Sequence, residues 1–346
     1  MTKREFLAVL GTAAATTLAP RAAWAQAGRI LGGPRGPDDP GVAASRSAEL
    51  AKFVSAVRVG ARKSHGGLHV FWLHGAPATA PIAIATPEEA RERGELTITE
   101  RERASVPSVV VENLGKRHVL LLAGEILLGG KQNRVVTEDV LLPPLSGPVD
   151  LQVYCVEQGR WNPEGSRAGF SARGTFAAPQ LRSKVIERQS QGEVWAEVDK
   201  YAQHFAAPSP TQSYQAIYDK AEVKAHQAEA EAALDQRTAS GALGAAVFTS
   251  SSFAALDLFQ DAGLFAREWP KLLRAHALDT YQRPSLKDTD EQGVRAQVEA
   301  LLRRAGSVEG TLRRNAGIGR LFEFRVDRKR GSALIAEGQV VHTAVL

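Results

Sequence analysis

Seven short apolar segments, separated from one another by turn residues, occupy the sequence between residues 68 and 156. Several of them are uninterrupted apolar runs, and this pattern predicts strands that are buried on both faces. Proline and glycine, as at Pro143–Pro144 and Gly147–Pro148, mark the turns between them. The expected strands lie at residues 68–74, 82–85, 96–99, 109–111, 119–122, 135–142 and 149–156.

From about residue 176 the apolar residues recur at helical spacing. The expected helices lie at residues 181–186, 194–201, 214–234, 258–278 and 294–302. Further strands are expected at residues 244–248, 322–326, 333–336 and 340–345. We therefore predict an α+β fold, with a β-rich N-terminal half, a helical middle and C-terminal strands that close the same domain.

The first 27 residues predict an export signal. Lys3 and Arg4 form a basic start, and residues 6–19 are mostly apolar or small. Ala23–Ala25 offers a cleavage site with two small residues, and Ala25–Ala27 offers a second one. The apolar stretch is shorter than the roughly 20 residues of a transmembrane helix. No stable membrane span is therefore expected after cleavage.

Residues 2–7 look like a twin-arginine signal in which Lys3 occupies the place of the first arginine. The twin-arginine route and the general secretory route are therefore both open. Either route predicts an exported protein that resides in the periplasm. The alternative is an uncleaved N-terminus that tethers the chain to a membrane.

Residues 28–48 are rich in glycine and proline and predict a flexible linker, which leaves residues 49–346 as a single domain. The chain has one cysteine, Cys155, so an intramolecular disulfide is excluded and the domain needs a hydrophobic core. The net charge of +5 falls to about +3 without the leader, which carries three basic residues and one acidic residue. This surplus is too small to predict nucleic acid as a partner.

The segment LLLAGEILLGGKQNR, residues 120–134, places an acidic residue, Glu125, inside an apolar run. A carboxylate is rarely buried without a partner. Four polar residues that suit an anion or a ligand hydroxyl follow it: Lys131, Gln132, Asn133 and Arg134. The alternative is a buried ion pair of Glu125 with a lysine or arginine, Lys131 or Arg134, next to a β-turn. A Walker A loop is excluded, because glycine and serine or threonine are missing from the required positions.

A second polar group, CVEQGRW at residues 155–161, follows the last of the seven apolar segments. Glu157 is a candidate acid or base, Arg160 a candidate anion clamp, and Trp161 a candidate stacking surface for a flat ring. The alternative is a turn at the strand end that a salt bridge holds together. Cys155 lies among apolar residues and is typical of a core cysteine.

Metal chemistry has little support in the sequence. His69 and His74 would point to opposite faces of a strand, and no CxxC, HExxH or GxSxG motif is present. A metal-dependent hydrolase that uses Glu125 with Glu138 or Asp139 ranks last among the hypotheses, because the spacing matches no ligand template. We predict no metal ligands.

The two segments GEILLGGKQNR (residues 124–134) and CVEQGRW together resemble the first type of the ARPP domain family, the ADP-ribosylglycohydrolase and rhodanese-phosphatase-superfamily associated protein domain. The likeness covers roughly residues 50–346. Ile126 occupies a position where many members are expected to carry a second acidic residue, so an activity that depends on that residue would be absent. Further similar segments are QGEVWAEV (191–198), SPTQSYQAIYDK (209–220), LDLFQDAGLFAREWPKLLRAHALD (256–279) and GSALIAEGQVVH (331–342).

The resemblance implies an ADP-ribose-like or other small, phosphorylated, nucleotide-derived ligand, but it implies no cofactor and no reaction. We expect one polar pocket in which Lys131, Arg134 and Arg160 hold an anionic group. Gln132, Asn133 and Gln158 would orient the ligand, and Trp161 would stack on it. Glu125 and Glu157 would exchange protons if hydrolysis occurs. The rival hypothesis is a non-catalytic structural or interaction protein whose polar groups form an ion-pair network. An enzyme and a binding protein are both compatible with the sequence, and the sequence predicts no particular oligomeric state.

Overall fold

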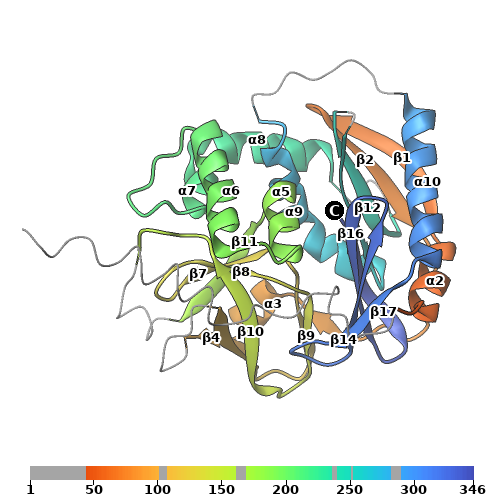
Figure 1. Cartoon of the computed structure of the whole chain (residues 1–346), viewed down its shortest axis with the longest axis horizontal. Coiled ribbons are helices and arrows are strands. Elements are labelled where there is room, and N and C mark those ends of the chain that lie inside the picture. The colour runs from red at the N-terminus through yellow and green to blue at the C-terminus, as the bar shows by residue number, and fades with distance from the viewer. Residues whose placement is uncertain (1–43, 101–106, 161–168, 236–239, 251, 282–289) are drawn as a thin grey trace, which may run out of the picture. The chain divides into compact units, whose positions relative to one another are not determined.

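The computed structural model describes residues 44–100, 107–160, 169–235, 240–250, 252–281 and 290–346. The expected export signal and Trp161 lie outside these residues, as does most of the expected linker. Residues 40–346 belong to one compact unit, and the fold is α+β, as predicted (Figure 1).

The largest sheet has eight strands, and every neighbouring pair in it is antiparallel. It joins the first described strands of the chain to the last ones. In spatial order its strands are β1 (Arg58–His65), β2 (Leu68–His74), β12 (Ala242–Thr249), β13 (Ser252–Phe259), β17 (Gln339–Val345), β16 (Lys329–Ala336), β15 (Arg320–Val326) and β14 (Gly310–Arg314).

Two smaller sheets contain the strands from the first half of the chain. The six-stranded sheet has the order β11 (Phe170–Phe176), β7 (Glu125–Gly129), β8 (Arg134–Val136), β10 (Gly147–Cys155), β5 (Ser108–Asn113) and β4 (Leu96–Thr99). The three-stranded sheet has the order β3 (Ile84–Ala85), β6 (His118–Leu121) and β9 (Val140–Leu142), with β3 and β6 parallel. Apolar side chains of these two sheets form a common core, in which Val119 and Leu142 meet Val111 and Leu127.

Eight helices pack around these sheets within the described residues. They are α2 (Ala48–Ser55), α3 (Pro87–Glu92), α5 (Pro179–Ile186), α6 (Gln191–His204), α7 (Gln215–Asp219), α8 (Ala221–Ala233), α9 (Ala262–Leu278) and α10 (Glu291–Ser307). Helices α2 and α10 contribute to a core with residues of the large sheet. Helices α5 to α8 contribute to a core with Ile126 and Val135 of the six-stranded sheet.

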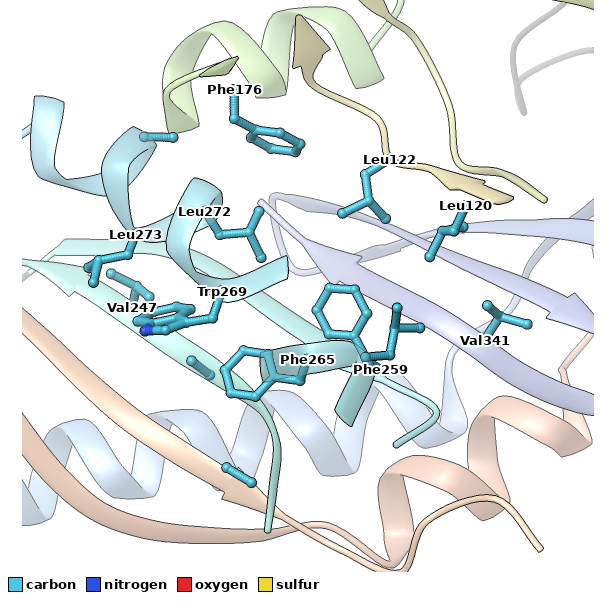
Figure 2. Packing of buried hydrophobic residues seen from close by; sticks show 14 of the residues in the cluster. Leu120, Leu122, Phe176, Val247, Phe259, Phe265, Trp269, Leu272, Leu273 and Val341 are labelled. Carbon is cyan, nitrogen blue, oxygen red and sulfur yellow. The ribbon is translucent and has the colours of Figure 1, made fainter. Parts of the chain in front are cut away.

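Helix α9 connects the large sheet to the strands of the smaller sheets. Trp269 and Leu272 of this helix pack with Val247 of the large sheet and with Leu122 and Phe176 (Figure 2). The indole of Trp269 also donates a hydrogen bond of 2.9 Å to the Leu234 carbonyl. This helix is 17 residues long and has its apolar residues on several sides, so most of it is buried.

Three sequence-predicted elements are divided in the structure. The expected strand 135–142 becomes β8 and β9 in different sheets, because the Asp139 carboxylate between them accepts the Ala123 amide and faces His342. The expected helix 214–234 is broken at Lys220, whose backbone is extended. The expected helix 258–278 begins only after Asp261, which caps it by accepting the Leu264 amide, and the apolar residues before this cap belong to strand β13.

Candidate functional site

A tight turn between β7 and β8 carries the polar residues that follow Glu125 in the sequence. Gly129 and Gly130 both have a positive φ, of 127° and 53°. A Cβ atom on Gly130 would overlap the ring of Phe170. Glycine is therefore needed here for both conformation and space, and this turn sets the positions of residues 131–134.

Side chains from this turn and from the end of β10 form one hydrogen-bonded group, which we call the Gln132–Arg160 cluster. The Gln132 amide donates to the Glu157 carbonyl at 2.8 Å, and the Asn133 backbone amide donates to the Glu157 carboxylate at 3.1 Å. The cluster consists of Glu100, Gln132, Asn133, Arg134, Cys155, Glu157, Arg160, Thr211 and Ser213. The structure thus brings together residues from the two segments that the sequence singled out.

Arg134 forms the inner end of the cluster, and its side chain is completely buried. Its guanidinium donates to the Cys155 Sγ at 2.8 Å and to the Gln132 Oε1 at 3.1 Å, and pairs with Glu100 at 3.3 Å. Burial raises the pKa of the Cys155 thiol to about 11, although Arg134 opposes the shift. Cys155 is therefore protonated at neutral pH and does not act as a nucleophile.

Arg160 forms the outer end and is partly exposed, at 28% for its side chain. It donates to the carbonyl oxygens of Gly130 (2.9 Å) and Gly129 (3.1 Å), and it pairs with Glu157 at 2.7 Å. Burial alone would raise the pKa of Glu157, but hydrogen bonds from Arg160 and Thr211 lower it on balance. Glu157 is therefore ionised at neutral pH.

The remaining expected ligand residues of this region differ in exposure. Lys131 is half-buried, and its backbone amide donates to Glu100 Oε1 at 3.1 Å. Gln158 is exposed, and its carbonyl accepts a long bond of 3.4 Å from Gln132. Trp161 lies outside the described residues. The solvent-facing end of the cluster is therefore Arg160, and Lys131 and Gln158 are the other expected ligand residues of this region that are not fully buried.

Glu125 belongs to a different buried group, which we call the Lys271 cluster: Glu88, Glu125, Glu268 and Lys271. The Lys271 Nζ lies 2.8 Å from an oxygen of Glu125 and 2.8 Å from one of Glu268, and both glutamates are completely buried. Burial raises the pKa of Glu125 well above its usual range, against the opposing charge of Lys271. Glu125 thus has a buried ion-pair partner, but it is Lys271 of α9 and neither Lys131 nor Arg134, which pairs with Glu100. Ile126, next to it, faces the apolar core.

A third buried group centres on His342 of β17. Its Nδ1 lies 2.6 Å from Asp139 and its Nε2 lies 3.1 Å from Asp257, while Arg182 holds Asp257 with bonds of 2.7 and 3.0 Å. Burial disfavours a charge on this ring, but the two aspartates raise the pKa of His342 to about 9. The imidazolium therefore bridges two carboxylates in the interior.

The two acidic residues of the metal hypothesis, Glu138 and Asp139, have basic partners of their own. Asp139 contacts His342, and Glu138 pairs with Arg313 and with Arg188. Within the part of the chain that the structure describes, no group of three or more His, Cys, Asp or Glu side chains is placed to hold a metal ion. Glu125 therefore does not form such a metal-binding group with Glu138 or Asp139.

Sequence reasoning did not single out Lys271, Asp257 or His342. Each is an isolated charged or titratable residue within an apolar segment, in EWPKLL, AALDLF and VVHTAV respectively. The same signal drew attention to Glu125. Applied to the whole chain, it would have selected these three residues as well.

Residues 56–346 match the family model of ARPP-1, the ARG and Rhodanese-Phosphatase-superfamily-associated Protein domain, and the chain belongs to this family. The resemblance found in the sequence is thereby confirmed. The family is associated with ADP-ribosylglycohydrolase and rhodanese-phosphatase systems. No curated protein and no solved structure matches the chain. Within the described ranges, no helix is long and apolar enough to cross a membrane.

Proposed function

We propose that the protein binds a small, phosphorylated, nucleotide-derived ligand of the ADP-ribose type at the solvent-facing end of the Gln132–Arg160 cluster. The observation that carries this proposal is the fixed position of Arg160. Its Nη atoms are held by Gly129, Gly130, Asn133 and Glu157, whereas no described residue accepts a hydrogen bond from its Nε. A guanidinium held in this way loses little conformational entropy when it contacts a phosphate.

Two further observations support this ligand class. Lys131 and Gln158 border the same cluster, because the Lys131 backbone amide donates to Glu100 and the Gln158 carbonyl accepts from Gln132, and neither residue is fully buried. The family association with ADP-ribosylglycohydrolases favours an ADP-ribose-like molecule over other phosphates.

We propose binding and not hydrolysis at this site. An acid–base pair for hydrolysis needs one protonated and one ionised carboxyl group close to the same bond. Glu157 is ionised and accepts hydrogen bonds from Asn133, Thr211 and Arg160. Glu125 has the raised pKa that suits an acid, but its ion pair is in the Lys271 cluster, and no described hydrogen bond or ion pair joins it to Glu157.

Thermal unfolding of the purified protein with and without ADP-ribose tests the proposal. Ligand at about 100 times its Kd stabilises the folded state by about 2.7 kcal/mol, which corresponds to a rise in Tm of about 5 °C for a domain of this size. Arg160→Ala and Lys131→Ala should abolish the rise. Lys116→Ala, at an exposed lysine of another turn, should leave it intact. No rise with ADP-ribose or with a panel of nucleotides and sugar phosphates would refute the proposal.

One observation favours the rival, a structural ion-pair network. The two arginines of the cluster are matched by two carboxylates, because Arg134 pairs with Glu100 and Arg160 with Glu157. On this hypothesis, Arg160→Ala lowers the Tm by the same amount whether ADP-ribose is present or not. The ligand-dependent difference between wild type and variant therefore separates the two functions.

We also propose that the protein is exported through its N-terminal 27 residues and works in the periplasm. The support is the sequence of this leader alone. Expression in a Gram-negative host, followed by fractionation and N-terminal sequencing, should give a periplasmic chain that begins near residue 26 or 28. A chain that retains Lys3 and Arg4 and stays in the cytoplasm or with the membrane would refute export.

A further inference from the structure

A groove with a volume of about 870 Å³ runs along the seam between α2 and α10. The two helices pack against each other and against the large sheet, where α10 contacts β1 and β15 and α2 contacts β17 (Figure 1). Gly306 permits the close approach of α10, since a Cβ atom there would lie 3.0 Å from Val54 Cγ2. The groove therefore follows from the packing of two defined helices and the start of β1, far along the chain from the Gln132–Arg160 cluster.

Apolar side chains form the floor of this groove. Val54 and Leu302 are buried, and Ala51, Val57 and Val59 are half-buried. Their apolar surface is recessed and does not project. The exposed large hydrophobic residues of the described chain, Leu114 and Leu145, lie elsewhere and do not line the groove.

The border of the groove is basic. Lys52, Arg58 and Arg303 line it and are exposed, and no described acidic side chain pairs with any of them. Glu299 is the one acidic residue among those that line it.

Other arginines of the same region are paired. Arg62 and Arg295 share Glu291, and Arg304 pairs with Asp327. The three cations at the groove differ from these neighbours in having no described acidic partner, and the groove combines an apolar floor with a net positive charge, three cations against one carboxylate.

We propose that the α2–α10 groove binds a small amphiphilic anion, a molecule with an apolar chain or ring and one carboxylate or phosphate group. Its volume lies within the range of small-molecule sites, about 300–1,000 Å³. The apolar part would cover Val57 and Val59, and the anionic group would face Arg58 and Arg303. The site is separate from the proposed nucleotide site.

Size and shape favour a small molecule over a macromolecule. The α10 residues that line the groove run from Glu299 to Ser307, a rise of about 12 Å at 1.5 Å per residue. This length is about two helical turns, too short for the apolar face of a typical partner helix. A membrane surface would need projecting apolar side chains, and those of the groove are recessed.

Calorimetric titration of the purified full chain tests this proposal with three ten-carbon probes below their micelle concentrations: decanoate, decyl phosphate and decyltrimethylammonium. The two anions should bind with one site per chain, and the cation should bind at least tenfold more weakly. The double variant Arg58→Glu/Arg303→Glu should weaken decanoate at least tenfold. Ser55→Trp, at an exposed position of the groove wall, should also weaken it by occupying space. Lys116→Glu serves as the control for a charge reversal outside the groove and should not change the affinity.

Several outcomes would overturn the proposal. Equal affinity for anionic and cationic probes would remove the role of the basic border. Decanoate binding that survives both the double variant and Ser55→Trp would place the ligand elsewhere, and the absence of binding by either anion would exclude the site. Groove-dependent cosedimentation with anionic vesicles would assign the surface to a membrane, and groove-dependent self-association in sedimentation would assign it to a second copy. Thermal melts confirm that each variant is folded before titration.

Discussion

Replacing Lys271 by methionine should strongly destabilise the fold at neutral pH. The Lys271 Nζ lies 2.8 Å from oxygens of both Glu125 and Glu268, whose side chains are completely buried. Methionine occupies a similar volume but leaves these carboxyl groups without a cation. Breaking a buried ion pair by removing one partner costs about 3–5 kcal/mol. Since domains are stable by only about 5–15 kcal/mol, this is a large share of the unfolding free energy.

The penalty of Lys271→Met should shrink as the pH falls. Burial raises the pKa of both Glu125 and Glu268 even with Lys271 present, and loss of the ammonium raises them further. A carboxyl group with a folded pKa above its unfolded pKa binds protons in the folded state first, so its folded state gains stability as the pH is lowered. The difference in unfolding free energy between wild type and variant should therefore be larger at pH 7.5 than at pH 5.5.

Urea unfolding followed by tryptophan fluorescence measures this difference at both pH values. Lys200→Met is a matched control, because Lys200 pairs with Glu197 at 2.9 Å with the same three-residue spacing as Lys271 and Glu268, yet it is 69% exposed. An exposed pair contributes about 0–1 kcal/mol. The reasoning is wrong if Lys271→Met costs no more than this control, or if its cost is independent of pH.

Three further predictions concern single residues. The proton on His342 should stabilise the fold fully below pH 6.5, and this contribution should disappear as the pH rises through about 9. Wild type should therefore lose more unfolding free energy than His342→Gln between pH 7 and pH 10. Parallel curves of unfolding free energy against pH for the two proteins would contradict the bridging imidazolium. Gly130→Ala should lower the unfolding free energy by about 1–3 kcal/mol more than Gly94→Ala does. Both positions have a positive φ, but only a Cβ atom at residue 130 would clash with a ring, that of Phe170. Equal urea midpoints for the two variants would contradict this. Cys155 should react with a thiol reagent only after denaturation, because it is buried and its pKa is raised to about 11; fast labelling of the folded protein would contradict the burial.

Strands that are buried on both faces were predictable because burial leaves a direct mark on the sequence. Leu68–Leu73 of β2 and Ala242–Phe248 of β12 are buried without interruption, and strands were expected at residues 68–74 and 244–248. The strand Ser252–Phe259 was not expected, because its apolar residues continue into those of α9 and only the cap at Asp261 separates the two. The helix break at Lys220 is tertiary in origin, since the Lys220 Nζ binds carbonyls of the loop at Phe205 and Ala206.

The candidate site was predictable in part for a similar reason. Gln132, Asn133 and Glu157 meet because β8 and β10 are neighbours in register, with Arg134 opposite Cys155. Sequence proximity to Lys131 suggested a local partner for Glu125, but the partner is 146 residues away on α9. Such long-range pairs leave no local spacing in the sequence, and only the isolated charge in an apolar segment indicates that a partner exists.

The position of β17 has a consequence for biosynthesis. This strand, residues 339–345, lies inside the large sheet between β13 and β16, while β1 and β2 come from residues 58–74. The sheet therefore stays incomplete until the ribosome has released almost the entire chain, and two strand edges remain open during that time. A frameshift or stop codon before residue 339 would not produce a slightly shorter protein. It would leave one edge of β13 and one edge of β16 unpaired in the middle of the sheet, and such a chain should be recognised by chaperones and degraded.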